Sequence, residues 1–260
     1  MRNFMICCIV VFTMTESAFG QTKEPSKRTS VDLGGGVTML LVLIPAGEFP
    51  MGDESGYESE KPVHKVKITK PFYLGKYVVT LQQWQAVMEN KPDPKGSKLP
   101  AGVAWDDCQT FLIKLNAKIG VQEGKFVLPT EAQWEYACRA GSTTKYCFGD
   151  DEAQLGDYAW YSANMVGTPH PVGEKKPNAW KLYDMHGNVW EWCADWYDPG
   201  YYAKSPVDDP QGPATGSDRV NRGGALDRAA WVCRSAFRSH GPASPGNCVG
   251  FRVARIPVEQ

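Results

Sequence analysis

About forty consecutive residues, from 142 to about 181, show neither the period of an amphipathic helix nor the two-residue period of a half-buried strand. The 26 glycines and 19 prolines make up 45 of the 260 residues, about 17% against an average of roughly 12%. Both residue types interrupt regular structure and favour turns. We therefore expect a loop-rich body with many turns and few long helices. The length suits one large domain or two small ones.

Charge and hydrophobicity narrow the class of protein further. The 28 basic and 29 acidic side chains give a net charge of −1. A nucleic-acid-binding protein usually carries a basic excess, so we expect no nucleic-acid partner. Apolar residues at 42% and charged residues at 22% are values of a globular chain.

The first twenty residues have the layout of a secretory signal peptide. Arg2 gives a short basic region, residues 4–14 are apolar, and Ala18 and Gly20 supply small residues before Gln21. This predicts an exported protein, periplasmic or secreted, with no membrane contact after cleavage of residues 1–20. An uncleaved amino-terminal anchor is the alternative. Residues 21–36 are polar and then glycine-rich, which predicts a flexible leader.

Periodicity predicts several regular elements in the rest of the chain. Strands are expected at 37–44, at 63–68 and at 72–79, with the last two side by side. Helices are expected at 80–90 and 104–119, and a third follows Thr130, which forms a capping box with Gln133. Late strands are expected at 189–192, 219–224, 233–238 and 250–256.

Six cysteines remain once residues 1–20 are removed: Cys108, Cys138, Cys147, Cys193, Cys233 and Cys248. An even number in an exported chain predicts disulfides, although six cysteines allow 15 pairings. No two cysteines have CxxC spacing and only four histidines occur, which argues against a zinc site.

The segment from Leu182 to Trp192 places two carboxylates, Asp184 and Glu191, around a Gly-Asn turn. Carboxylates and turn carbonyls are the oxygen ligands that Ca²⁺ prefers. Alternatively, Asp184 and Asn188 only hold the turn through side-chain to backbone hydrogen bonds. The residues by themselves favour the turn interpretation.

Five motifs in one order resemble the formylglycine-generating enzyme family, also called the sulfatase-modifying factor family. They begin at Ile44, Leu128, Leu182, Arg219 and Gly250, and read IPAGEFPMG, LPTEAQWEYAC, LYDMHGNVWEW, RVNRGG and GFRV. The resemblance implies one α+β domain over residues 37–257, a loop-rich variant of the C-type lectin fold. It also implies a possible protein substrate, a sulfatase, in which the enzymes of the family oxidise a cysteine to formylglycine.

The resemblance places the copper site of those enzymes after the Gly-Gly turn, where two cysteines hold the metal. The second cysteine corresponds to Cys233, which makes Cys233 the candidate catalytic residue. The first corresponds to Arg228, and an active-site serine corresponds to Ala225. An arginine offers no thiolate to Cu(I), so these departures argue against the oxidase chemistry. Cys233 is then a ligand, a reactive thiol or, most simply, half of a disulfide.

The resemblance also implies a calcium site and a bridge. The calcium ligands would be Asp184, Gly187, Val189 and Glu191, with side-chain oxygens at the ends and carbonyls between them. This reverses the preference for the turn interpretation. One family disulfide falls on Leu112 and Val253, and a shifted bridge between the nearby Cys108 and Cys248 is our hypothesis.

Two classes of function therefore stay open. The first is an oxidative enzyme acting through Cys233 on a sulfatase or another thiol substrate. The second is a non-catalytic binding module with a C-type-lectin-like scaffold, which Arg228 and Ala225 favour. Bulky aromatic residues could form the contact surface of such a module, with core packing as the alternative, which we expect for half or more of them. They are Trp160, Tyr161, Trp196, Tyr197, Tyr201 and Tyr202.

Overall fold

The computed structural model describes residues 28–88, 98–120, 124–243 and 249–256. Its largest sheet has five antiparallel strands in the spatial order β1–β2–β5–β11–β6. These are β1 (Arg28–Asp32), β2 (Thr38–Ile44), β5 (Phe72–Gly75), β11 (Ala254–Ile256) and β6 (Lys125–Val127). The carboxy-terminal strand β11 lies between β5 and β6, so the last segment of the chain completes this sheet.

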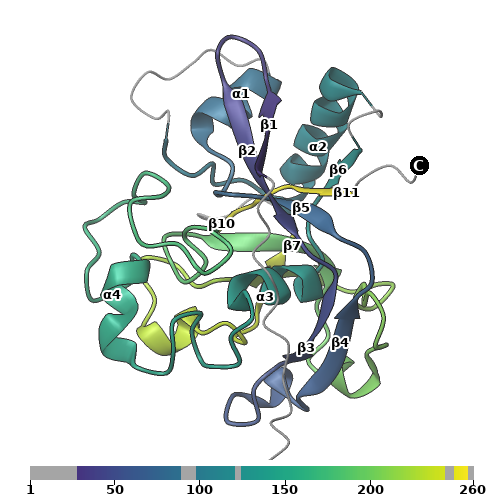
Figure 1. The fold of residues 1–260 in the computed structure, drawn as a ribbon, viewed down its shortest axis with the longest axis vertical. Coiled ribbons are helices and arrows are strands. Elements are labelled where there is room, and N and C mark those ends of the chain that lie inside the picture. Colours follow the sequence, from purple (N-terminus) through teal and green to yellow (C-terminus); the bar gives the residue numbers. More distant parts are fainter. Residues whose placement is uncertain (1–27, 89–97, 121–123, 244–248, 257–260) are drawn as a thin grey trace, which may run out of the picture.

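Two smaller sheets extend from the first (Figure 1). One has the order β10–β7–β8–β9, in which only β10 and β7 run parallel. Its strands are β10 (Val249–Gly250), β7 (Trp190–Trp196), β8 (Asp218–Arg222) and β9 (Ser239–Pro242). The other is a two-stranded ribbon of β3 (Gly47–Met51) and β4 (His64–Ile68).

The described residues contain four α-helices: α1 (Leu81–Met88), α2 (Trp105–Ile119), α3 (Glu131–Arg139) and α4 (Leu155–Tyr158). The predicted helix over 104–119 is confirmed as α2, with Ala104 as its amino-terminal cap and Gly120 at its end. The capping box of α3 is confirmed too. Thr130 Oγ1 accepts the Gln133 N–H at 3.1 Å, and Gln133 Oε1 accepts the Thr130 N–H at 3.0 Å.

The core divides into two large clusters and a small one. One large cluster fills the space between α2 and the five-stranded sheet, and includes Phe111, Phe126 and Phe251. The other lies under α3 around Trp134, which is fully buried. The small cluster packs Tyr146, Leu155, Ala159, Ala230 and Cys233 beside α4. This third cluster matters for function because it buries the candidate catalytic cysteine.

Several expectations differ from the structure. The strands at 63–68 and 72–79 do not pair with each other, because β4 pairs with β3 and β5 pairs with β2 and β11. The expected strand over 233–238 is wrong, since a short 3₁₀ helix, Ala230–Cys233, precedes β9 and residues 234–238 belong to no strand. The expected leader at 21–36 contains β1, which pairs with β2.

The segment from 142 to 181 is irregular as expected, apart from α4 and a 3₁₀ turn at Glu152–Gln154. Mixed helices and strands in one body confirm the α+β class. Within the described ranges, no helix is long and apolar enough to cross a membrane. Residues 1–20, the expected signal peptide, lie outside the described residues.

Candidate functional site

The chain turns back on itself directly after β8, at Gly223 and Gly224. Both have positive φ, +94° and +76°, a conformation that side chains disfavour. A Cβ atom on Gly224 would lie 2.6 Å from the Cys233 Sγ atom. The second glycine of the motif is therefore required for the backbone to pass against the cysteine.

Cys233 is the last residue of the 3₁₀ helix and is 0% exposed. Burial raises the pKa of its thiol to about 12, although the backbone of Ala225 donates a hydrogen bond that opposes this shift. A thiol with so high a pKa is protonated at neutral pH and is a poor nucleophile when no metal is bound. The candidate catalytic residue is therefore closed to solvent in this structure.

His186 has a structural role in this buried region, because its ring bonds to the backbone of two separate segments. Its Nδ1 donates to the Cys233 carbonyl at 2.8 Å, and its Nε2 accepts the backbone N–H of Cys147 at 3.1 Å. These partners fix the tautomer, because one is only an acceptor and the other only a donor. Both ring nitrogens are occupied, which leaves neither free as a general base.

Arg228 stands on the outside of the same turn. Its side chain is 52% exposed, with Nε 3.4 Å from a carboxylate oxygen of the neighbouring Asp227. Ala225 is buried, and its carbonyl accepts the Arg228 N–H at 3.0 Å. A guanidinium at Arg228 leaves Cys233 as the single sulfur of this segment, which does not fit a two-thiolate copper site.

A pocket of about 420 Å³ opens beside Arg228, and we call it the Arg228 pocket. Asn221 lies in it almost fully buried, and the Oδ1 atom of its amide has no hydrogen-bond partner. Such an oxygen is costly to bury unless a ligand or water satisfies it. The pocket is lined by Trp190, Trp192, Asn221, Arg228, Trp231, Val232, Phe237, Ser239, His240, Gly241, Pro242 and Val249.

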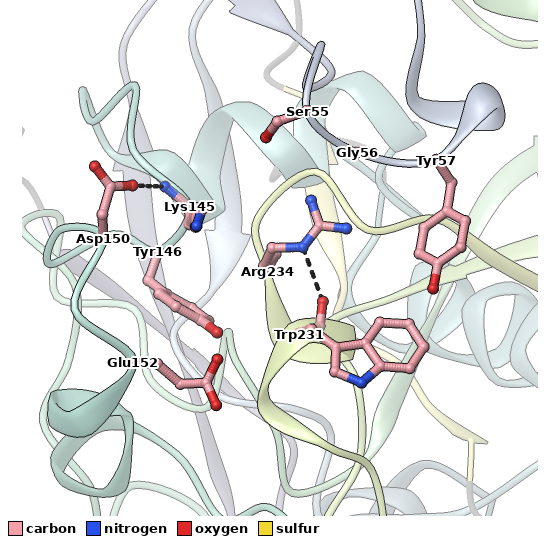
Figure 2. Close-up of a pocket in the computed structure, with 9 residues that line it drawn as sticks. All are labelled: Ser55, Gly56, Tyr57, Lys145, Tyr146, Asp150, Glu152, Trp231 and Arg234. Atoms are coloured by element: carbon pink, nitrogen blue, oxygen red, sulfur yellow. Dashed lines mark hydrogen bonds between the residues drawn. The ribbon is translucent and has the colours of Figure 1, made fainter.

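The exposed indole of Trp231 also lines a second pocket of about 570 Å³. We call it the Tyr57 pocket, and Figure 2 shows its lining side chains. Its walls come from the loop after β3, from the segment before α4 and from the 3₁₀ helix that ends at Cys233. One aromatic side chain therefore borders two depressions on the surface.

Asp184, the first expected calcium ligand, is 2% exposed and has a φ of +60°. Its Oδ2 accepts the Gly173 N–H at 2.9 Å, whereas its Oδ1 is buried without a partner. Burial raises the pKa of the carboxyl group to about 6. An unpaired, buried carboxylate oxygen is what a bound cation would satisfy, so Asp184 fits the expected role.

Glu191, the last expected ligand, is committed to other partners. Its carboxylate accepts from Arg252 Nε at 2.6 Å, from Arg252 Nη2 at 2.5 Å and from Trp134 Nε1 at 2.7 Å. Among the described residues, no three His, Cys, Asp or Glu side chains gather into a metal centre. Calcium here would depend on Asp184, on the carbonyls of Gly187 and Val189, and on the remaining lone pairs of Glu191.

The Asn188 side chain does not hold the turn in which it lies but bonds to the backbone of His170. Its Oδ1 accepts the His170 N–H at 2.9 Å and its Nδ2 donates to the His170 carbonyl at 3.0 Å. The side chain thereby fastens the irregular segment around residue 170 to the Asp184–Glu191 segment. The Asn188 carbonyl also accepts the Leu226 N–H at 3.0 Å, which links both to the Arg228 turn.

Sequence reasoning missed a set of buried arginine–carboxylate pairs beneath the site. Arginine is usually exposed, so a sequence gives little sign that one is buried. The signal that could have indicated these pairs is the frequent arginine between residues 219 and 238. The pairs are Arg139 and Arg222 with Glu135, Arg234 with Glu60 and Asp53, and Arg238 with Glu131. They anchor the segment that carries Cys233 to α3 and to the loop after β3.

None of the six aromatic residues considered for a contact surface is exposed, which favours the alternative of packing within the fold. Tyr202 is buried and the other five are half-buried. Trp160, for example, stacks on the His170 ring with 3.7 Å between ring centroids. The exposed aromatic side chains near the site are instead Tyr57 and Trp231.

The cysteines also differ from expectation. Cys108, Cys138, Cys147, Cys193 and Cys233 are all free in the structure. Cys108 is buried on α2, where its Sγ donates to the Ala104 carbonyl, so the expected bridge from Cys108 is absent. Its proposed partner Cys248 lies outside the described residues. Leu112 and Val253 are buried in the same cluster, as an apolar pair in place of a bridge.

The family model of the sulfatase-modifying factor enzyme 1-like domain matches residues 37–257. The chain belongs to this family. A formylglycine-generating enzyme of Streptomyces coelicolor is 30% identical, over 82% of this chain and 88% of that protein.

Solved structures agree with this assignment and give the lectin-like variant of the fold. Treponema denticola variable protein 1 superimposes with a TM-score of 0.80 and 31% identity, over 88% of this chain and 99% of that one. PvdO from Pseudomonas aeruginosa superimposes with a TM-score of 0.77 and 28% identity, over 90% of this chain and 99% of that one. Family membership thus agrees with the sequence motifs.

Proposed function

We propose that this chain is a binding module of the sulfatase-modifying factor family, which holds a protein or peptide ligand at the Arg228 pocket and does not oxidise it. One observation carries the proposal: Arg228, which the resemblance matches to the first copper cysteine of the enzymes, presents a half-exposed guanidinium, and the Cys233 thiol is buried. One sulfur does not make a two-thiolate metal site, while a pocket of about 420 Å³ lies beside Arg228.

The lining of the Arg228 pocket supports a particular ligand chemistry. The rings of Trp190, Trp192 and Phe237 offer flat apolar surface, which suits an aromatic or aliphatic group. Arg228 supplies a positive charge at the rim, which suits a carboxylate or phosphate. The unpaired Asn221 Oδ1 accepts a hydrogen bond from an N–H or O–H donor. A peptide with an aromatic residue next to an acidic group combines all three.

Replacing Arg228 with glutamine is expected to weaken binding of an aromatic carboxylate by about five-fold, or ~1 kcal/mol, because it removes one partly exposed charge pair. We would titrate the protein with N-acetyl-phenylalanine and with N-acetyl-phenylalaninamide and follow the tryptophan indole signals by NMR. The acid should bind more tightly than the amide, and Arg228→Gln should abolish this difference.

Lys114→Gln, on the exposed face of α2, is the matched control and should leave both dissociation constants unchanged. Equal binding of the acid and the amide to the unmodified protein would contradict the proposal. So would an equal loss of affinity in the Lys114 variant.

We also propose that Ca²⁺ binds at Asp184, which the unpaired Oδ1 of that residue supports. Adding calcium to protein prepared in EDTA should raise the melting temperature. The stabilisation reaches ~2.7 kcal/mol when free calcium is about 100 times the dissociation constant. Asp184→Asn should abolish the increase, while Asp157→Asn, an exposed acid paired with Lys176, should retain it. Equal melting temperatures in calcium and in EDTA would rule out the site.

Export of the protein remains part of the proposal. The amino-terminal layout of Arg2 and residues 4–14 supports it. An exported binding module would meet its protein ligand outside the cytoplasm.

A further inference from the structure

The Tyr57 pocket has one aromatic side and one charged side (Figure 2). Tyr57 and Trp231 stand together on one side, and Glu152, Lys145 and Tyr146 face them across the cavity. The pocket shares Trp231 with the Arg228 pocket but none of the other side chains that carry the proposed function.

The aromatic side is exposed and yet fixed in place. Tyr57 is 53% exposed and Trp231 is 47% exposed, with 5.7 Å between their ring centroids. Phe237 packs edge-on against both rings, at 5.9 Å from Tyr57 and 5.6 Å from Trp231. Two large rings held open to solvent offer their faces to a ligand without having to be ordered first.

Arg234 lies between the two sides, but its guanidinium is already paired with carboxylates and is not available to an anionic ligand. Its Nη1 donates to Asp53 and to Glu60, and its Nη2 donates to Glu60, each at 2.8 Å. Its Nε donates to the Trp231 carbonyl at 2.9 Å. Two carboxylates therefore compensate one guanidinium, and this buried group carries an excess negative charge.

The charged side adds to that excess. Glu152 is exposed and its carboxylate points into the cavity beside the Tyr146 ring. Asp150 accepts the backbone N–H of Lys145 at 2.9 Å and also lines the cavity. The pocket and the group behind it thus hold four carboxylates, Asp53, Glu60, Asp150 and Glu152, against two cations, Lys145 and Arg234.

We propose that the Tyr57 pocket is a second binding site, which receives the guanidinium or ammonium group of a basic peptide side chain. The cation would lie against the faces of Trp231 and Tyr57, which attract positive charge, and would pair with the Glu152 carboxylate. A planar guanidinium suits this arrangement best, because it stacks on a ring while its edge donates to a carboxylate.

Together with the Arg228 pocket, the Tyr57 pocket indicates what kind of peptide would occupy both. This step alone rests on the proposed function. The Arg228 pocket favours an anionic group and the Tyr57 pocket a cationic one, and Trp231 lines both pockets. A peptide with an acidic and a basic side chain could then lie across Trp231 in one orientation only.

The test compares N-acetyl-arginine methylamide with its citrulline analogue, which has nearly the same shape but no charge. We expect the arginine compound to bind at least five-fold more tightly in an NMR titration. Glu152→Gln, an isosteric change at an exposed side chain, should reduce this preference to two-fold or less. Tyr57→Leu should weaken binding of the arginine compound as well.

Two controls separate this site from the Arg228 pocket. Glu58→Gln changes an acid whose side chain is 92% exposed and lies outside the pocket lining, and it should not change the affinity. Arg228→Gln should not weaken binding of the arginine compound, so failure of one site leaves the other standing. Equal binding of the arginine and citrulline compounds, or an unchanged preference in Glu152→Gln, would overturn the proposal.

Discussion

Replacing Arg252 with methionine is expected to lower the free energy of unfolding by about 3–5 kcal/mol, because it leaves a buried carboxylate without its partner. Arg252 and Glu191 are both 0% exposed. The guanidinium holds both oxygens of Glu191 and also donates to the carbonyls of Gly75 and Tyr183, each at 3.0 Å. Chemical denaturation in EDTA measures the change without a contribution from calcium.

Two further variants show whether the unpaired charge causes this loss. Arg228→Met removes an arginine that is half-exposed, and should change the stability by less than about 0.5 kcal/mol. Adding Glu191→Gln to Arg252→Met should recover part of the lost stability, since the unpaired group is then neutral. If Glu191→Gln lowers the stability of the Arg252→Met variant by as much as it lowers that of the unmodified protein, the two changes are additive. Lost packing, and not the unpaired buried charge, would then be the cause.

Replacing Asp195 with asparagine is expected to change how stability depends on pH. Asp195 is 3% exposed on β7, and its Oδ2 accepts the Glu131 N–H at 2.8 Å. Burial, and then repulsion from Glu131, raise the pKa of the carboxyl group from 3.8 to about 7. A raised pKa means that the folded state binds the proton more tightly than the unfolded state does.

The contribution of Asp195 is therefore complete below about pH 3.8 and is lost as the pH rises through about 7. The full loss is on the order of 4 kcal/mol, at 1.36 kcal/mol for each pKa unit. Asparagine stays neutral, so the stability of Asp195→Asn minus that of the unmodified protein should increase by this amount between pH 4 and pH 8. Urea denaturation at a series of pH values measures it.

Asp157→Asn gives the opposite sign and so serves as the control. A hydrogen bond from Lys176 lowers the pKa of the Asp157 carboxyl, so its ionisation favours the folded state. The stability of that variant relative to the unmodified protein should not increase with pH. A difference for Asp195→Asn that stays flat from pH 4 to pH 8 would show that Asp195 is already ionised in the folded protein.

Local sequence determined what could be predicted of the fold. Helix α2 could be predicted from its one apolar face, and the start of α3 directly after Thr130 from a capping box between residues three apart. Strand pairing depends on residues far apart in the chain, which period-two patterns do not report. Nothing near β5 indicates that its neighbour is β11, about 180 residues later.

In the candidate site, too, the local features could be predicted from the sequence and the long-range contacts could not. The nearness of Cys233 and Arg228 to the Gly-Gly turn could be read from spacing, because both follow the turn within one short segment. Burial of the thiol comes from Tyr146, Leu155 and Ala159, in a segment without any period. The two pockets were missed for the same reason, since Tyr57 meets Trp231 only through the folded chain.

The central claim is that this member of the family binds its ligand without oxidising it. We would incubate the protein with copper, oxygen and a sulfatase peptide that contains the C-x-P-x-R motif, and follow aldehyde by mass spectrometry. A formylglycine-generating enzyme with both cysteines serves as the positive control. We predict no aldehyde above the copper-free blank, because Arg228 and the buried Cys233 cannot form a two-thiolate site. Aldehyde that forms with copper, and disappears in a Cys233→Ser variant, would contradict the claim.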